Sequence, residues 1–215
     1  MSSLIVAVRS AEGLTLVADH RLITPEGLID HPYPAWVTLP TFAVAITGII
    51  DLPRSPFDPG AVVGTFFREH AHVLNSETLA GCAQALEDHA RKIQPRLPAG
   101  LDASFAFTDF LICSAMAPPA HRIATIRAYL DGRASRVTFH PDAACIGLLA
   151  HVAHMEHTAA KLAGADAGTI IGALSLEFTR LAPLVGGPLT AVILRGDPQS
   201  GNNPTPMYSL EPALN

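Results

Sequence analysis

The start of the chain has two apolar runs separated by a short polar turn. Residues 3–9 (SLIVAVR) are apolar and rich in β-branched side chains, and residues 14–18 (LTLVA) form a second such run that stops at Asp19. The intervening residues 10–13 (SAEG) are mostly small or polar and include a glycine. Two apolar runs joined in this way are typical of a β-hairpin. The pattern therefore predicts an antiparallel hairpin over residues 3–19.

Similar short apolar runs recur between clusters of turn residues. They predict strands at residues 35–39, 42–47, 104–115, 121–130, 135–139 and 189–194, with one more possible short strand at 207–210. The dipeptide Asp131-Gly132 is a strong hairpin signal between two of these runs.

Helical spacing of apolar residues predicts four helices. We expect them at about residues 58–74, 77–93, 145–162 and 167–183, with the apolar run of the third beginning at residue 143. Pro59 after Asp58 suits a helix start. The predicted order along the chain is strands, two helices, strands, two helices and a final strand, which is typical of an α+β fold.

Composition narrows the class of protein. The chain has 215 residues, of which 49% are hydrophobic and 15% charged, and a net charge of −5. We expect a single domain over residues 1–195 and a tail over 196–215. The negative net charge gives no reason to expect a nucleic-acid partner. The three cysteines lie far apart in apolar runs, which favours reduced, buried thiols in a cytoplasmic protein. Neither a signal peptide nor a membrane-spanning run is expected.

Several positions resemble the N-terminal nucleophile (Ntn) hydrolases, in their proteasome-subunit and HslV branch. Ser2 and Ser3 follow the initiator Met, Asp19 and Arg21 close the predicted hairpin, and Gly48 ends a later strand. The segment VGGPLTAVIL at residues 185–194 is similar to a glycine turn into a late strand of the family. The resemblance implies a four-layer αββα sandwich of two stacked antiparallel sheets flanked by helix pairs, over roughly residues 1–195.

The resemblance also implies a kind of chemistry. A free N-terminal Ser2 or Ser3 would carry the nucleophilic hydroxyl. An α-amino group has a pKa of about 7.7–8.0, so the nucleophile would carry its own base. Asp19 would orient the site, and the Gly48 N–H would stabilise the oxyanion of an amide or peptide substrate. No cofactor is expected.

The chain departs from the family at important positions. Family active sites use a lysine on the strand before the Gly48-type loop, but the only lysines here, Lys92 and Lys161, fall on predicted helices. The later acid and serine of the family correspond to Ala182 and Val185, and its middle serine loop to residues 142–145 (DAAC). Arg21 is the candidate substitute for the lysine, by analogy with acylases of the superfamily.

The register of the nucleophile is also unsettled. Ser3 lies sixteen positions before Asp19, which fits the family spacing, but ordinary removal of Met1 would expose Ser2. Two functions stay open: a proteasome-like homo-oligomer with weak or no activity, and an N-terminal-Ser amidohydrolase or peptidase. A small-molecule binding module has no positive sequence feature. Each residue also has a plain structural interpretation, since Asp19 can cap a turn and Gly48 can permit a bend.

Ten histidines raise the question of a metal site. His151, His154 and His157 are spaced by three residues on a predicted helix, but 3.6 residues per turn prevents all three from sharing a face. His70 and His72 are two apart and face different ways on a helix. We therefore expect histidines at the solvent or at subunit interfaces, and no metal.

The fourth predicted helix is apolar on more than one face. Its apolar residues are Ile170, Ile171, Ala173, Leu174, Leu176, Phe178, Leu181 and Leu184. A helix apolar nearly all round must be covered on more than one side. We therefore expect the chain to bind itself, as a ring or double ring with helix contacts between subunits.

Overall fold

The computed structural model describes residues 4–24, 27–30, 36–39, 41–48, 80–81, 84, 88, 106–129, 133, 136–181, 185, 187–196 and 207–210. Within these residues the chain forms strands, two α-helices and a short 3-10 helix. No helix among them combines the length and hydropathy needed to cross a bilayer.

The first sheet has five antiparallel strands in the order β10-β1-β2-β11-β12. It is built around the hairpin of β1 (Leu4–Ser10) and β2 (Gly13–Asp19). The hairpin is flanked by β10 (Ala143–Gly147) on one side and by β11 (Leu189–Arg195) and β12 (Met207–Leu210) on the other. Gly13, at the turn, has φ +143°, and a Cβ there would lie 2.2 Å from the Leu194 carbonyl oxygen, so this position requires glycine.

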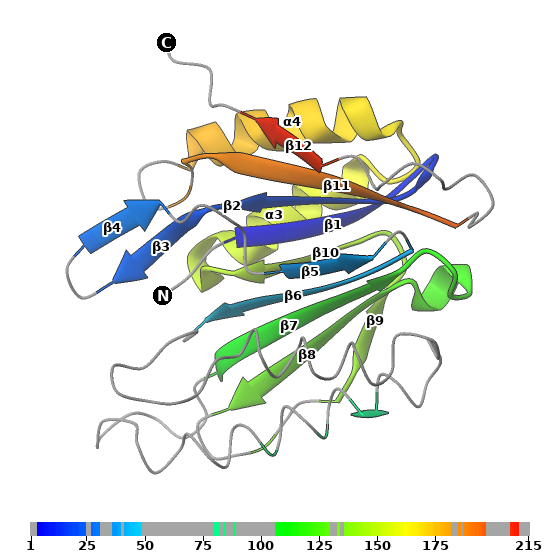
Figure 1. The fold of residues 1–215 in the computed structure, drawn as a ribbon, viewed down its shortest axis with the longest axis horizontal. Helices are drawn as coiled ribbons and strands as arrows, with labels where there is room; N and C mark the ends of the chain where they lie inside the picture. Colours follow the sequence, from blue (N-terminus) through cyan, green and yellow to red (C-terminus); the bar gives the residue numbers. More distant parts are fainter. Residues whose placement is uncertain are drawn as a thin grey trace.

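The second sheet also has five antiparallel strands, in the sequential order β5-β6-β7-β8-β9. These strands are β5 (Trp36–Leu39), β6 (Phe42–Gly48), β7 (Ala106–Ser114), β8 (Ile123–Tyr129) and β9 (Thr138–His140). The 3-10 helix η2 (Pro119–His121) connects β7 to β8. A separate two-stranded hairpin of β3 (Arg21–Thr24) and β4 (Gly27–Asp30) projects from the end of the first sheet at which β1 begins (Figure 1).

The helices α3 (Leu149–Lys161) and α4 (Ala167–Arg180) cover the outer face of the first sheet (Figure 1). Asp166 is the N-cap of α4, and its side chain accepts a hydrogen bond from the Thr169 N–H at 2.9 Å. The Glu12 carboxylate in the β1–β2 turn accepts the Ala167 N–H at 3.1 Å, so the turn also docks on this helix start.

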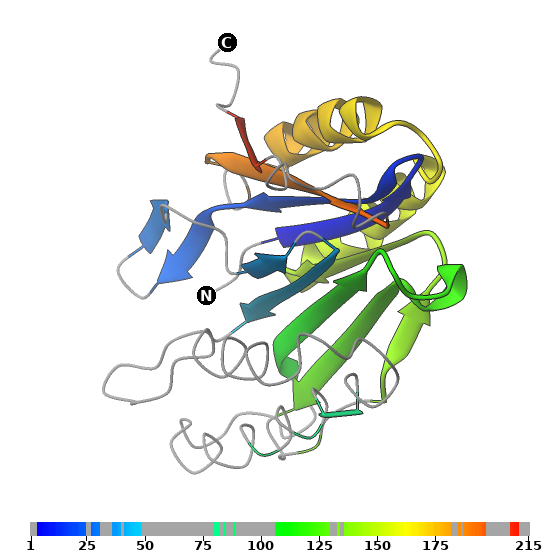
Figure 2. The same cartoon turned by 45° about the vertical axis from the view of Figure 1, so that its right-hand side comes forward.

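Two apolar layers hold the described fold together. The inner layer lies between the two sheets and includes Ile5, Leu16, Leu111 and Ile123, with β10 and β1 packed over β6, β7 and β8. Figure 2 shows this stacking from a second direction. The outer layer lies between the first sheet and the helices, and its members are Leu4, Val6, Val8, Val17, Ala143, Cys145, Met155, Ala159, Ile170, Leu174, Phe178, Val185, Leu189 and Ala191. Residues of β1 and β10 alternate between the two layers, because successive strand side chains point to opposite faces.

The fold is thus an α+β sandwich of stacked antiparallel sheets with helices outside, the αββα class that the sequence predicted. The predicted hairpin, the other strands and the last helix are confirmed, with ends that differ by a few residues. In the region of the predicted second helix, Ala80, Gly81, Gln84 and Asp88 are helical. The helix at 58–74 and the turn Asp131-Gly132 lie outside the described residues.

One prediction of secondary structure is wrong. The sequence predicts a helix from about residue 145, but residues 143–147 form the strand β10 and α3 begins only at Leu149. A short apolar run such as AACIG does not distinguish strand from helix by its periodicity. Pairing with β1, with Val6 opposite Cys145, decides the outcome, and Gly147 at φ +127° separates strand from helix.

Candidate functional site

Asp19 binds the backbone at the start of β1. Its Oδ1 accepts a hydrogen bond from the Leu4 N–H at 2.6 Å, and the carboxylate is fully buried. The register of the hairpin explains the contact, since Ile5 lies opposite Ala18 and the end of β2 therefore meets the start of β1. A buried carboxylate needs hydrogen-bond donors to remain in an apolar layer, and this N–H is one of them.

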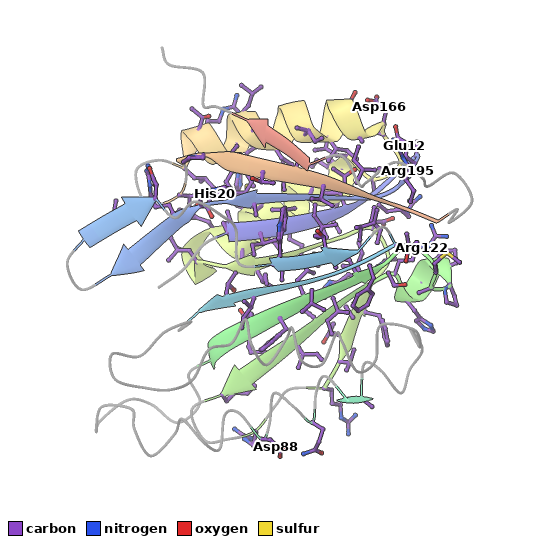
Figure 3. The ribbon with its side chains drawn as sticks, viewed as in Figure 1. Glu12, His20, Asp88, Arg122, Asp166 and Arg195 are labelled. Atoms are coloured by element: carbon purple, nitrogen blue, oxygen red, sulfur yellow. The ribbon has the colours of Figure 1, made fainter. Side chains whose placement is uncertain are left out.

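His20 follows Asp19 and was not singled out from the sequence. It is 5% exposed, and its Nε2 lies 2.7 Å from Thr190 Oγ1 on β11. The His20 N–H also donates to the Pro188 carbonyl at 3.1 Å, so the chain leaving β2 is bonded to the glycine-rich turn before β11. Figure 3 shows His20 at the end of β2, far from the Glu12 turn. No local pattern identifies this pair, because its members are 170 positions apart.

Arg21 is bound to Asp30 across the β3–β4 hairpin. Its Nε donates to Asp30 Oδ1 at 2.9 Å and its Nη2 to Oδ2 at 3.3 Å. The hydrogen bond with Asp30 is the main reason why the pKa of Arg21 lies above its usual value, and the charge of Asp19 adds to the shift. Arg21 is therefore a cation near Asp19 that is at least partly neutralised by Asp30.

The turn before β11 packs directly on this ion pair. Gly187 has φ +74°, and a Cβ at this position would lie 2.5 Å from Asp30 Oδ1. The glycine turn, Asp19, His20 and Arg21 thus come together at one end of the first sheet.

Gly48 belongs to the second sheet, where it ends β6 opposite Thr108. The neighbouring Thr47 is fully buried, and its hydroxyl has no hydrogen-bond partner among the described residues. Thr47 lies opposite Asp109 on β7, which in turn lies opposite Arg127 on β8. These three residues form a polar row on the face that otherwise packs against the first sheet.

The row contains a half-buried ion pair that the sequence did not reveal. Arg127 Nε donates to Asp109 Oδ1 at 2.7 Å, and the Asp109 side chain is 10% exposed. Burial raises the pKa of the Asp109 carboxyl, and the hydrogen bond and charge of Arg127 oppose that rise without cancelling it. The hydrogen bond with Asp109 raises the pKa of Arg127 in return.

The predicted catalytic residues are therefore partly brought together. Asp19 and Arg21 lie at the same end of the first sheet, and Gly48 lies in the second sheet. Ser2 and Ser3 lie outside the described residues. Trp36 is the one of residues 34–37 whose side chain is described, and it packs against the inner apolar layer. Lys161 ends α3 and is exposed, while Lys92 lies outside the described residues.

Neither of the described cysteines is suited to act as a nucleophile. Cys113 and Cys145 are free and buried, as the sequence predicted for the chain's thiols, while Cys82 lies outside the described residues. Burial raises the pKa of both thiols, and the charges of Glu156, Asp19 and Asp109 raise that of Cys145 further.

Several of the described histidines contact a neighbouring hydroxyl or acid. His154 Nε2 lies 3.1 Å from Glu177 Oε2, between α3 and α4. In the described part of the chain, no group of three or more His, Cys, Asp or Glu side chains has a geometry that holds a metal ion. His70 and His72 lie outside the described residues.

Comparisons with known proteins agree on the fold. No family model and no curated protein sequence matches the chain. Three similar solved structures are Anbu from Hyphomicrobium sp. strain MC1 (17% identity, TM-score 0.58), Anbu (ancestral beta-subunit) from Yersinia bercovieri (14%, 0.59), and an Anbu (Gly-1) mutant from the same Hyphomicrobium strain (18%, 0.57). Each alignment covers 98% of this chain and 88%, 88% and 89% of the respective partner.

These comparisons show that the chain has the same fold as the Anbu structures. They also correct the sequence prediction. The assignment to the proteasome-subunit and HslV branch is wrong, because the solved structures that the fold matches here are Anbu proteins. The physical reason is that the hairpin, Asp19 and the glycine turn are features of a shared architecture, and such features do not separate its branches.

Proposed function

We propose that this chain is a self-associating, proteasome-like subunit whose N-terminal site has weak or no hydrolase activity. Its partner is a second copy of the chain, in a ring or double ring. The observation that carries the proposal is Leu176 on α4, a large apolar side chain that is 63% exposed. The opposite face of the same helix buries Ile170, Leu174 and Phe178 against the first sheet. Leu176 is the most exposed large apolar side chain among the described residues, and its place on a well-packed helix suits a subunit contact.

The experiment is sedimentation of the wild-type protein and of Leu176→Glu at micromolar concentration. The matched control is Thr179→Glu, which adds the same charge at another exposed position of α4. We expect an oligomer for the wild type and the control, and a shift toward smaller species for Leu176→Glu. A stable wild-type monomer of 22.6 kDa would refute the proposal. A subunit interface larger than about 1,000 Å² is the structural expectation.

The proposal of low activity rests on the missing lysine and on the pairing of the cation near Asp19. The chain has no lysine in residues 34–37, and Arg21, the candidate substitute, is engaged by Asp30. A cation that is already paired lowers the pKa of a nearby nucleophile less than a free one would. The polar row of Thr47, Asp109 and Arg127 likewise pairs its cation with an acid.

The second candidate function is an N-terminal-Ser amidohydrolase or peptidase acting on a peptide or small amide. It is favoured by the hydrogen bond between Leu4 N–H and Asp19 Oδ1. Ser3 is bonded to Leu4, and consecutive Cα atoms lie about 3.8 Å apart across a trans peptide bond. Of the two serines, Ser3 is therefore tied more closely to the Asp19 carboxylate. In this role Ser3, or Ser2, is the nucleophile, with Asp19 and Arg21 orienting the site and Gly48 donating to the oxyanion.

Mass spectrometry of the mature N-terminus separates the two functions. Catalysis through Ser3 requires loss of both Met1 and Ser2, since a serine inside a peptide bond has no α-amine to act as base. A chain that keeps Met1 rules out the amidohydrolase and leaves the self-associating subunit. We further propose a cytoplasmic location and a division into a domain of residues 1–195 and a tail of 196–215. The pairing of β12 with β11 attaches part of that tail to the first sheet.

A further inference from the structure

A hydroxyl, an imidazole and a carboxylate lie next to one another at the edge of the second sheet. Thr125 Oγ1 on β8 lies 2.9 Å from His140 Nε2 on β9. His140 Nδ1 lies 3.1 Å from Glu156 Oε1 on α3. The three residues come from a central strand, an edge strand and a helix that covers the other sheet, so only the packed fold brings them together.

The acceptor character of the carboxylate determines where the protons lie. The Glu156 carboxylate lies 3.1 Å from His140 Nδ1, and its negative charge favours the form of the imidazole that carries a proton on that nitrogen. In the neutral imidazole Nε2 is then the acceptor, and the Thr125 hydroxyl donates to it. The hydroxyl thus points its proton at a base that a third group orients, which is the arrangement of an activated nucleophile.

The three side chains are only partly buried. The side chains of His140 and Glu156 are 20% and 35% exposed, and Thr125 is half-buried. They are separate in sequence from Asp19, His20 and Arg21. The other described histidine–glutamate pair, His154 with Glu177, has no hydroxyl bonded to its imidazole among the described residues.

We propose that Thr125, His140 and Glu156 form a second reactive site, at which small activated esters acylate the Thr125 hydroxyl. Thr125 Oγ1 attacks the ester carbonyl carbon and forms a new C–O bond, while its proton passes to His140 Nε2. The ester C–O bond breaks with its electron pair on the leaving alkoxide or phenolate. Glu156 stabilises the imidazolium, which then releases its proton to water or to the leaving group.

Hydrolysis of the acyl group follows the same path in reverse. Water attacks the acyl carbon, His140 Nε2 takes the proton from that water, and the proton is transferred to Thr125 Oγ1 as its bond to the acyl carbon breaks. The products are a free carboxylic acid and the original hydroxyl. The thiols of Cys113 and Cys145 do not compete with Thr125 for the acyl group, because burial raises the pKa of both.

The experiment treats the full chain with p-nitrophenyl acetate and digests it with trypsin. Cleavage after Arg122 and Arg127 releases residues 123–127 (IATIR), in which Thr125 carries the only hydroxyl. We expect this peptide to gain the mass of one acetyl group. An acetyl group on residues 1–9 instead would report Ser2, Ser3 or the α-amine, so failure here and activity at the N-terminal site are distinguished.

Variants test the role of each residue. Thr125→Val, which keeps the shape of threonine, should abolish acetylation of the 123–127 peptide, and Thr125→Ser should retain it. His140→Gln should slow acetylation by about 10²-fold, the lower range for loss of a general base, and Glu156→Gln should slow it less. The matched control His154→Gln removes an exposed imidazole of α3 and should leave the rate unchanged. The proposal would be overturned by an unmodified 123–127 peptide together with equal p-nitrophenolate release by wild type and Thr125→Val. Equal acetylation rates in wild type and His140→Gln would also overturn it.

Discussion

The carboxylate of Asp19, at the end of β2, is bonded to the Leu4 N–H at the start of β1 over 2.6 Å, in a fully buried position. This one contact joins the two ends of the hairpin and ties the acid to the first described residue of the chain. It stabilises the hairpin whether or not the N-terminal site is catalytic. Its energetic role is therefore testable without an assay of activity.

Replacing Asp19 by alanine should lower the free energy of unfolding by about 1–3 kcal/mol, because the Leu4 N–H then lacks this acceptor in a buried place. Asp19→Asn keeps an acceptor oxygen and removes the charge, so it should cost less. Urea denaturation measures both values. If the asparagine variant were as unstable as the alanine variant, the acceptor would not be the stabilising feature.

The stability of the Asp109 region should depend on pH. The pKa of Asp109 is raised in the folded protein above its ordinary value of 3.8, chiefly by burial. The folded state then binds more protons than the unfolded state as the pH falls toward 3.8, so this residue's contribution to stability is present at low pH and is lost as the pH rises through the folded pKa. The unfolding free energy of wild type minus that of Asp109→Asn should therefore increase on acidification. A difference that stays constant or decreases would contradict this prediction.

Gly187 should resist replacement for two separable reasons. Alanine there would strain a backbone at φ +74° and place its Cβ 2.5 Å from Asp30 Oδ1. Gly164→Ala is the matched control, since it has φ +88° with nothing within 4 Å of the new Cβ. Thermal unfolding should show a backbone cost of about 1–2 kcal/mol in the control and a larger cost at Gly187.

The additional cost at Gly187 is expected to come from the displaced Asp30, which would weaken the ion pair with Arg21. In an Asp30→Ala background the cost of Gly187→Ala should fall toward that of Gly164→Ala. Unchanged costs in the two backgrounds would show that Asp30 is not responsible.

Replacing Gly172, in the middle of α4, by alanine should stabilise the folded protein. A Cβ at this position meets nothing within 4 Å in the described chain. Alanine in a helix interior is favoured over glycine by about 0.5–1 kcal/mol. Gly168→Ala is the comparison, because its Cβ would lie 3.2 Å from Asp166 Oδ1. This variant should gain less stability than Gly172→Ala. Loss of stability in Gly172→Ala would indicate that a neighbouring subunit approaches the helix there.

The sequence by itself determined the local elements of this protein. The two apolar runs around a glycine turn specify the β1–β2 hairpin, since period-two side chains and a turn are short-range properties. Asp166 followed by helical spacing similarly specifies the start of α4. The hairpin pattern alone also places Asp19 at the end of β2, whereas the stacked sandwich was expected from the family resemblance.

Tertiary structure decided what local pattern leaves ambiguous. Residues 143–147 form a strand because they pair with β1 in the first sheet. His20 contacts Thr190, which is 170 positions away in the sequence, and Asp109 contacts Arg127, which is 18 positions away. Thr125, His140 and Glu156 likewise converge from three elements. Such contacts depend on strand order and layer packing, which no short window of residues encodes. The sequence named Ser2, Ser3, Asp19, Arg21 and Gly48 as candidate residues. Only the folded protein shows that Asp19 bonds to the Leu4 N–H and that Arg21 is paired with Asp30.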